Sequence, residues 1–348
     1  MRKGAKRPQT IKDLGEFGFI RSITNGCINN NEEVIQGIGD DCAVIGPFGD
    51  KVLLITTDLL AEDIHFILDK IPPEHIGEKA IAVNLSDIAA MGGRPRHAFV
   101  SIAIPPSFPI AALNALYKGM KEICKRFGVN ILGGDTSASS TDLFINIAVT
   151  GVANKDKVLY RKGASVGDIL YVCGTLGASM AGLKILKGEM PASESHWPPL
   201  VLAHTRPQPL VAEGIVIGSS GLASAMIDVS DGLVADLGHI CEQSGVGAEI
   251  HEESLPLPEA LISLAQQYHL DPIDFALMGG EDYCLLVSVP DGNARQFEQI
   301  LVREAGTRPV AIGRITKATG VRCIRADGRE RPLSRGGYEH FSPRLTGD

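Results

Sequence analysis

The chain has 348 residues, enough for two domains, and 44% of them are hydrophobic, as in an ordinary globular protein. The net charge of −8 argues against a general nucleic-acid-binding protein, which usually carries a basic face. No run approaches the ~18 apolar residues of a membrane span. The basic start MRKGAKRPQT also lacks the apolar segment of a signal peptide. We expect a cytoplasmic protein with no nucleic-acid or membrane partner.

The first half of the chain is predicted to alternate strands with helices. Residues 1–36 are polar and irregular, apart from a short amphipathic piece at 14–20. From apolar spacing and from the positions of proline and glycine we then expect, in order, a strand (51–60), a helix (72–92), a strand (96–105), a helix (109–127) and two strands (129–136 and 142–153).

The polar loop ANKDK follows residue 153 and predicts a domain boundary, with domains at 1–153 and 154–348. The second half alternates again, so the expected fold class is α/β. Its expected elements are a strand (167–174), a helix (177–186), a proline-rich loop (188–200), a strand and helix (224–245), a helix (258–269), a strand (283–290), a helix (293–304), two strands (308–316 and 321–325) and a final loop, RGGYEHF.

The seven cysteines form no CxxC pair, and most lie in apolar surroundings such as LYVCGT and EDYCLLV. Free cysteine prefers such surroundings. The pattern therefore indicates reduced core thiols and neither a disulfide nor a zinc framework.

Acids stand at the ends of several otherwise apolar segments. They are Asp40, Asp41, Asp58, Asp87, Asp135, Asp228, Asp231, Glu281 and Asp282. Asn84 and Asp87 share one face of their predicted helix. Any single acid, for example Asp135 or Asp231, is as well explained by a helix N-cap or an Asx turn. The repetition of the pattern indicates one shared site.

Carboxylates that lie close together have raised pKa values unless something neutralises them. Basic residues beside these motifs are few: Lys79, Arg94 and Arg96. We therefore expect a metal, not an arginine, to cancel the charge. Oxygen ligands beside the hydroxyls of Thr56, Thr57 and Ser230 suit Mg²⁺ better than zinc, and Mg²⁺ commonly shares its ligands with substrate phosphates. The pattern indicates nucleotide-dependent phosphoryl chemistry, although the chain has neither a P-loop nor a protein-kinase motif set.

Eight segments occur in the order found in thiamine-monophosphate kinases. They are GIGDDCAV, ITTDLLAEDIHF, KAIAVNLSDIAAMGGRP, GGDTS, YRKGASVGD, IDVSDGLVADLGHI, GGEDY and the terminal GGYEHF. Each is short and weak alone, but the ordered set is specific and spans roughly residues 15–341. The chain resembles this family, which belongs to a superfamily with aminoimidazole ribonucleotide synthetase and selenophosphate synthetase.

The resemblance implies a two-domain α/β (α+β) fold. The N-terminal mixed sheets of two subunits would pair in a homodimer, beside a C-terminal α/β domain. It also implies that thiamine monophosphate and ATP give thiamine diphosphate and ADP by direct in-line transfer. Catalysis would then be positioning and charge neutralisation by several Mg²⁺ ions, with a monovalent cation as a further candidate cofactor.

Residue by residue, the resemblance assigns three sets of contacts. The Mg²⁺ ligands would be Asp41, Thr56, Thr57, Asp58, Asp87, Asp135, Asp228 and Asp231, of which the catalytic ones would be Asp87, Asp135 and Asp231. ATP would contact Tyr117, Gly134, Arg161 and Ser230. Thiamine monophosphate would contact His65, Glu281 and Tyr338.

Physical chemistry agrees with several of these assignments. The planar fork of Arg161 suits phosphate oxygens. Tyr338 offers a stacking surface to a cationic aromatic ligand, and Glu281 offers a counter-charge. Taken alone, His65 is equally a satisfied loop histidine, and Tyr338 a residue that docks the terminal segment. Further groups could orient the ligands; they are Asp40, Asn84 and Asp282.

Two motifs depart from the family pattern. GGDTSAS lacks an arginine that many members carry after Asp135, which puts a local phosphate or structural contact in doubt. Cys284 replaces an acid in GGEDYCL and is expected on a strand outside the site.

Other classes of protein were weighed against this resemblance. Cys27 lacks the glycine-rich context of the reactive residue in selenophosphate synthetases, and the ending RLTGD lacks the functional cysteine of the hydrogenase-maturation relative. A non-catalytic metal-dependent nucleotide-binding protein would tend to lose some of the acids. A merely solvated acidic surface would carry runs of acids.

Overall fold

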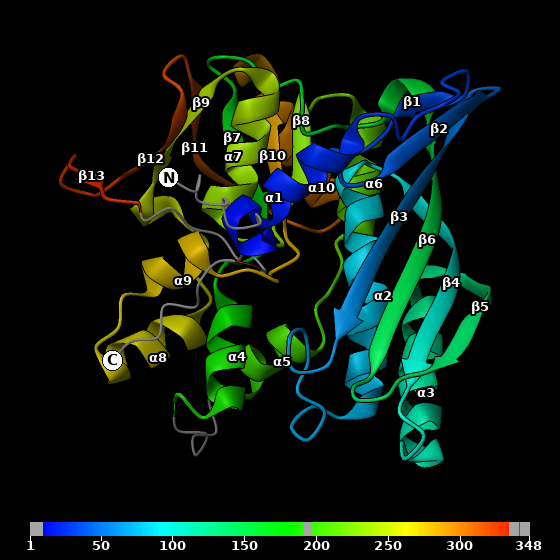
Figure 1. The fold of residues 1–348 in the computed structure, drawn as a ribbon. Coiled ribbons are helices and arrows are strands. Elements are labelled where there is room, and N and C mark those ends of the chain that lie inside the picture. Colours follow the sequence, from blue (N-terminus) through cyan, green and yellow to red (C-terminus); the bar gives the residue numbers. More distant parts are fainter. Residues whose placement is uncertain (1–9, 191–196, 334–340, 342–348) are drawn as a thin grey trace, which may run out of the picture.

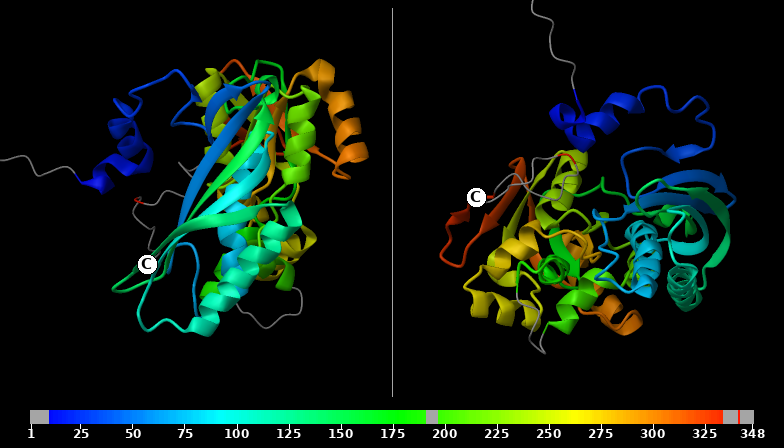
Figure 2. Two further views of the ribbon diagram at one scale, coloured as in Figure 1. Left: turned by 90° about the vertical axis from the view of Figure 1, so that its right-hand side faces the viewer. Right: turned by 60° about the horizontal axis from the view of Figure 1, so that its bottom comes forward.

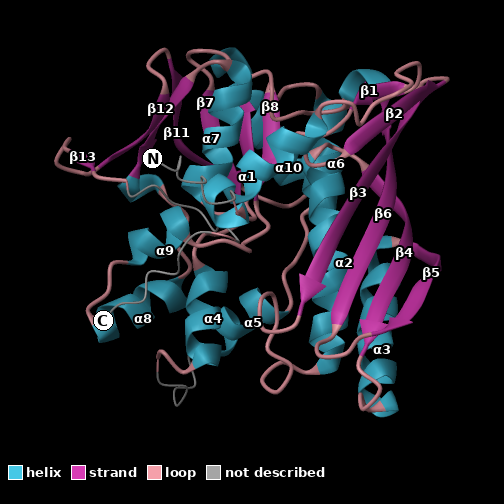
Figure 3. Ribbon diagram, in the orientation of Figure 1, coloured by secondary structure: helices cyan, strands magenta, loops and turns pink. Residues whose placement is uncertain are grey.

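The computed structural model describes residues 10–190, 197–333 and 341, which form two β-sheets side by side with helices packed against both (Figure 1). The strands fall into two separate groups, drawn in magenta in Figure 3. The fold is mixed α/β, as the sequence predicts. Within the described ranges, none of the helices combines the length and the hydropathy needed to cross a bilayer.

The first sheet has six strands in the order β1-β2-β3-β6-β4-β5, and only its β4–β5 pair is parallel among the described strands. The bounds are β1 (Val34–Gln36), β2 (Ala43–Phe48), β3 (Lys51–Ala61), β4 (Arg94–Ile104), β5 (Asn130–Ala138) and β6 (Phe144–Asn154). Helices α2 (Pro73–Ala90) and α3 (Ile110–Phe127) cover one face (Figure 2). The opposite face, which we call the open face, carries half-buried and exposed side chains such as Leu53, Thr57 and Phe99.

The second sheet has seven strands in the order β13-β12-β9-β11-β7-β10-β8. The strands are β7 (Ile169–Cys173), β8 (Ala225–Asp228), β9 (Gly247–His251), β10 (Leu285–Val289), β11 (Val310–Thr316), β12 (Gly320–Ile324) and β13 (Glu330–Arg331). The helices of this half are α4 (Ala178–Lys187), α5 (Pro198–Thr205), α6 (Val211–Ser220), α7 (Leu233–Ser244), α8 (Glu259–Tyr268), α9 (Pro272–Met278) and α10 (Ala294–Glu304).

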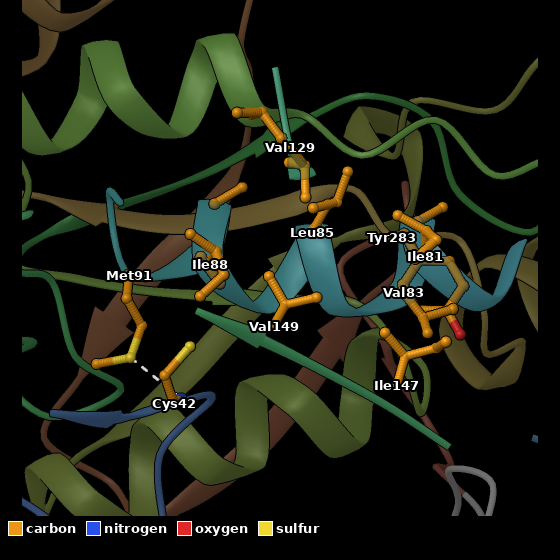
Figure 4. Close-up of a cluster of buried hydrophobic side chains, with 14 of the residues drawn as sticks. Cys42, Ile81, Val83, Leu85, Ile88, Met91, Val129, Ile147, Val149 and Tyr283 are labelled. Atoms are coloured by element: carbon orange, nitrogen blue, oxygen red, sulfur yellow. Dashed lines mark hydrogen bonds between the residues drawn. The ribbon is translucent and has the colours of Figure 1, made fainter. Parts of the chain in front are cut away.

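Helix α2 contacts both halves of the chain, because it packs on β3 and β6 of the first sheet and on β8 and α6 of the second half. It is buried along most of its length, and the buried positions include the polar residues Glu78, Lys79, Asn84 and Ser86. Figure 4 shows its side chains among strand residues of the first sheet and beside Tyr283 of the second half. The backbone N–H of Cys42 donates to the sulfur of Met91 at 3.1 Å, which fixes the start of β2 against the end of α2.

The periodic elements agree with the sequence prediction, but four helices do not follow from it. Helix α1 (Ile11–Thr24) lies in the stretch predicted as mostly irregular, and α5, α6 and α9 were not predicted. Helix α6 shows why local helix propensity did not predict these helices. Gly214 and Gly218 are poor helix formers, yet they allow close contact with α2. A Cβ on Gly214 would lie 2.3 Å from the carbonyl oxygen of Ala89.

Helices α2 and α3 also meet through glycine. A Cβ on Gly119 would lie 1.9 Å from the carbonyl oxygen of Glu74. Gly119→Ala should therefore push the helices apart and lower the free energy of unfolding by about 1–3 kcal/mol, measured by urea unfolding. Gly238→Ala is the matched control, because its Cβ would meet nothing within 4 Å. It should leave stability unchanged or raise it by up to ~1 kcal/mol. Equal effects of the two changes would contradict the close helix contact.

Candidate active site

A cavity of about 2070 Å³ is lined by both halves of the chain. Its walls come from the N-terminal arm (residues 16–41), the free end of β3, the inner side of α2, the turn before α7 and the loop before β10. The free end of β3 is exposed to the cavity because β2 pairs only with its first part.

Three carboxylates meet at one end of this cavity. Asp41, Asp87 and Asp228 bring oxygen atoms within 4.8 Å of one another, and they come from the turn before β2, from α2 and from the end of β8. Hydroxyl groups support them. Thr56 Oγ1 donates to Asp87 at 2.5 Å, and Ser86 Oγ donates to Asp228 at 2.5 Å. The alternation of β3 places Thr56 and Asp58 on the same face, toward α2.

Burial raises the pKa values of all three carboxyl groups, and repulsion from neighbouring carboxylates raises those of Asp87 and Asp228 further. The pKa of Asp228 rises to about 8, first through burial and then through Asp41. The pKa of Asp87 lies well above its ordinary value through burial, Asp58 and Asp228. Asp58 follows to about 6, chiefly through burial. The raised pKa values show that the protein around the cluster does not fully stabilise the ionised carboxylates.

Arg161 supplies part of the compensating charge. Its Nη2 and Nε atoms lie 2.5 and 3.1 Å from Asp41 Oδ1, and its backbone N–H donates to Asp40. The expectation that a metal and not an arginine cancels the charge is thus wrong for Asp41. Sequence proximity could not reveal this partner, because Arg161 is 120 residues away along the chain. One guanidinium still leaves the charges of Asp87 and Asp228 uncompensated.

The donor atoms of the cluster suit a hard cation. Asp41 Oδ2 is buried and has no hydrogen-bond partner among the described residues. The other available donors are carboxylate and hydroxyl oxygens. The nearby Cys42 thiol stays protonated, because burial and then Asp87 raise its pKa well above the ordinary value. Oxygen-only ligation of this kind fits Mg²⁺ better than zinc.

A second acidic group lies across the cavity. Asp231, Asp236 and His239 also bring ligand atoms within 4.8 Å of one another. Asp236 accepts the N–H groups of Asp231 and Gly232 at 3.1 and 3.0 Å, so it fixes the turn that begins α7. Asp236 and His239 were not predicted as site residues. Their i, i+3 spacing on a helix directly after Asp231 was the available signal.

The remaining substrate residues meet near the other end of α2. His65 and Glu281 both line the cavity, and the ammonium group of Lys79 touches both of them. Ser230 also lines the cavity, and its carbonyl oxygen accepts the N–H of Glu281 at 2.7 Å. Glu281 therefore already has a basic partner within the chain, which the sequence did not reveal.

Several predicted residues are not gathered into the cluster within one chain. Thr57 lines the cavity but points to the open face, where its hydroxyl meets Asn146 at 3.2 Å. Tyr117 is half-buried on α3, and Gly134 and Asp135 lie on the edge strand β5. Asp135 pairs with Ser101 and shares its open face, three strands from β3, or roughly 14 Å at the usual strand spacing. Tyr338 lies outside the described residues.

Asp282 and Cys284, which the sequence also singled out, lie outside the acidic cluster. Asp282 accepts the N–H groups of Gly177 and Ser179 at 2.6 and 3.2 Å, so it caps the start of α4. Cys284 is buried directly before β10 and is not among the cavity-lining residues, so it lies outside the cavity as expected.

The chain matches the family description "AIR synthase related protein, N-terminal domain" over residues 39–153 and "AIR synthase related protein, C-terminal domain" over residues 165–325. The thiamine-monophosphate kinase of Aquifex aeolicus (strain VF5) is 36% identical over 331 residues, which cover 95% of this chain and 99% of that relative. The chain belongs to the thiamine-monophosphate kinase family.

Other comparisons agree with this family. The thiamine-monophosphate kinase of Bacillus subtilis (strain 168) is 35% identical over 334 residues, or 94% of this chain and 100% of the relative. A solved structure described as AaThiL complexed with AMPPCP and TMP superposes with a TM-score of 0.84 at 35% identity, and the match covers 96% of this chain and 99% of that one. The family resemblance of the motifs and the α/β fold class are both confirmed.

The Asp41–Arg161 pair gives this family member a direct test of its site electrostatics. Arg161→Met should lower the free energy of unfolding by about 3–5 kcal/mol, because it leaves Asp41 as an unpaired buried carboxylate. The measurement is urea unfolding in a metal-free buffer. Arg314→Met is the control, because the Arg314–Asp291 pair at 3.1 Å is exposed and should contribute only about 0–1 kcal/mol. A loss as small as that of the control would show that the buried pair contributes little.

Proposed function

We propose that this chain transfers the γ-phosphoryl group of ATP to the phosphate of thiamine monophosphate, giving thiamine diphosphate and ADP. The observation that carries the proposal is the carboxylate cluster of Asp41, Asp87 and Asp228, set at a large cavity of a thiamine-monophosphate kinase family member. The relative described with AMPPCP, an ATP analogue, and TMP supports the same pair of substrates.

The reaction needs no covalent intermediate on the protein. An oxygen of the acceptor phosphate forms the new bond to the γ-phosphorus as the bond to the ADP oxygen breaks. The chain's contribution is to hold the two substrates in line and to exclude water.

Asp41, Thr56, Asp58, Asp87 and Asp228 would hold Mg²⁺, with Asp231 on the opposite wall. When bound, Mg²⁺ would neutralise phosphate oxygens and the charge that develops on them during transfer. Arg161 is placed to move between Asp41 and an ATP phosphate, and Ser230 lines the same region. His65 and Glu281, with Tyr338 from the terminal segment, would form the acceptor site. A monovalent cation remains a candidate without a residue set of its own.

We further propose that the domains divide at residue 153, and that two chains pair through the open face of the first sheet. This face exposes apolar side chains; they are Leu53, Ile55, Leu59, Phe99, Ala148 and Val152. Apolar surface of this kind usually marks an interaction site. Pairing would also place Thr57, Gly134 and Asp135 of each chain against the other chain. We propose that their predicted contacts to metal and ATP are made there, together with Tyr117.

The dimer has a simple test. In light scattering, the protein should have twice the 37.0 kDa mass of the chain. Phe99→Asp should shift the mass to that of one chain, because it buries an unpaired charge in the interface. Val166→Asp is the control, since Val166 is also exposed but lies outside the first sheet, and it should remain a dimer. A monomeric parent protein would refute the pairing.

The kinase activity is tested by incubating the protein with ATP and Mg²⁺ and with thiamine, thiamine monophosphate or no acceptor in parallel. Thiamine diphosphate and ADP should form in equal amounts, and only with thiamine monophosphate. ATP use that requires selenide or an amidine substrate would point to a sister enzyme, and binding without turnover to a non-catalytic protein.

Asp87→Asn should lower kcat by at least ~10²-fold while the fold stays intact, because a charged ligand is lost at the cluster. Asp282→Asn is the matched control: Asp282 is also buried, but it caps α4, and asparagine can cap as well. Its kcat should change only a few-fold. Near-normal turnover of the Asp87 variant would make Asp87 a structural residue.

A further inference from the structure

Lys79 is a buried ammonium group in the middle of the molecule. It lies on α2, its side chain is 1% exposed, and it borders the cavity. Its Nζ is 2.8 Å from Glu281 Oε1 and 3.0 Å from the carbonyl oxygen of His65. Burying an ammonium group is unfavourable unless it is paired and hydrogen-bonded. The groups that pair with Lys79 therefore show which parts of the chain this residue holds together.

The two partners come from distant parts of the chain. His65 lies in the loop after β3, and Glu281 lies in the loop between α9 and β10. Both loops border the cavity at the proposed acceptor site. One side chain on a rigid, buried helix therefore links the two loops and sets their separation.

The second oxygen of Glu281 is also occupied. Oε2 lies 3.1 Å from Nδ1 of His204, a buried residue of α5. Burial and then Lys79 lower the pKa of His204, so the imidazole is neutral. Because a carboxylate only accepts hydrogen bonds, we assign the imidazole hydrogen to Nδ1. Burial would raise the pKa of Glu281, but Lys79 and His204 outweigh it and lower the pKa. Glu281 is thus a carboxylate held at both oxygens.

The backbone of Glu281 is held in an unfavourable conformation. Its φ is +62°, in the left-handed region that non-glycine residues rarely adopt, and Tyr283 follows with φ +49°. The N–H groups of these residues donate to Ser230 and Val229 at 2.7 and 2.8 Å. Strain of this kind persists where surrounding contacts enforce it, and it is often found at binding sites.

The loop after β3 holds His65 in one defined tautomer. The backbone N–H of Ala61 donates to Nδ1 of His65 at 3.0 Å, so Nδ1 is an acceptor and the ring hydrogen is on Nε2. An Nε2–H group is a donor of the kind that a phosphate oxygen accepts. The contact from Lys79 to the His65 carbonyl fixes the backbone that carries this ring.

We propose that Lys79 is a positioning residue of the acceptor site, which it builds by tying the His65 loop to Glu281, with His204 holding the far oxygen of Glu281. This inference rests on the proposed function. Because Lys79 is cationic and Glu281 is anionic, their pair has no net charge. The site would then recognise the acceptor through fixed geometry and hydrogen bonds, and the cationic ring would not meet a free carboxylate.

The test compares Lys79→Met, Glu281→Gln and the double variant in two measurements. The first is the melting temperature. The second is KM for thiamine monophosphate and for ATP. Lys79→Met should lower the melting temperature, because it leaves a buried carboxylate unpaired, and the double variant should recover most of that loss. Each variant should raise KM for thiamine monophosphate by about 10-fold or more, and KM for ATP by less than about 3-fold.

The double variant separates positioning from support of the fold. If Lys79 and Glu281 act as one unit, its KM for thiamine monophosphate should match that of either single variant. Recovery of KM together with the melting temperature would show that Lys79 only stabilises the fold. A KM that multiplies the two single effects would show that the residues act separately. Either result would overturn the inference.

The chain offers a matched control on the same two helices. Glu78 and Arg206 form an ion pair between α2 and the end of α5, with contacts of 2.8 and 2.7 Å, and neither is among the cavity-lining residues. Arg206→Met should lower the melting temperature, because it leaves the buried Glu78 carboxylate unpaired, and should leave both KM values within about 2-fold of the parent. A parent protein with no turnover of thiamine monophosphate would refute the proposed function itself. Its stable variants, compared by binding of thiamine monophosphate in calorimetry, would still test the role of Lys79.

Discussion

The mutual repulsion of three closely spaced carboxylates is the constraint on which the rest of this structure depends. Asp41, Asp87 and Asp228 come from three separate elements; Asp41 and Asp228 are buried, and Asp87 is half-buried where it lines the cavity. Burial raises the pKa of each, and Arg161 offsets only part of the charge. Folding alone gains nothing from such a cluster, so it is best explained by a cation that binds with a nucleotide.

Helix α2 converts this cluster into a site with fixed dimensions. It carries Lys79 and, eight residues later, Asp87, a separation of about 12 Å along a helix. The helix is packed between the two sheets, so its position does not adjust easily. The acidic cluster and the acceptor loops are thus held at a set distance by one rigid element, which is what direct transfer between two substrates requires.

The sequence predicted the fold class, the periodic elements and most members of the acidic cluster, because apolar spacing and acids at element ends are local signals. It did not predict α6, where glycines that lower helix propensity allow close packing on α2. It also missed the partners of the acids. Arg161 and His204 reach Asp41 and Glu281 through tertiary packing, which no local pattern encodes, whereas Asp236 contacts its own turn at Asp231 and Gly232. Asp135 carries a motif signal, but in a single chain it faces away from the cluster.

We propose that Mg²⁺ and nucleotide phosphates together compensate the excess negative charge of the cluster. The most direct measurement is the melting temperature in MgCl₂ and in NaCl at the same ionic strength, each with and without ADP. The account predicts that Mg²⁺ stabilises the protein beyond NaCl, that ADP adds to the effect only when Mg²⁺ is present, and that Asp228→Asn weakens both effects. Equal melting temperatures in the two salts, with or without ADP, would contradict it.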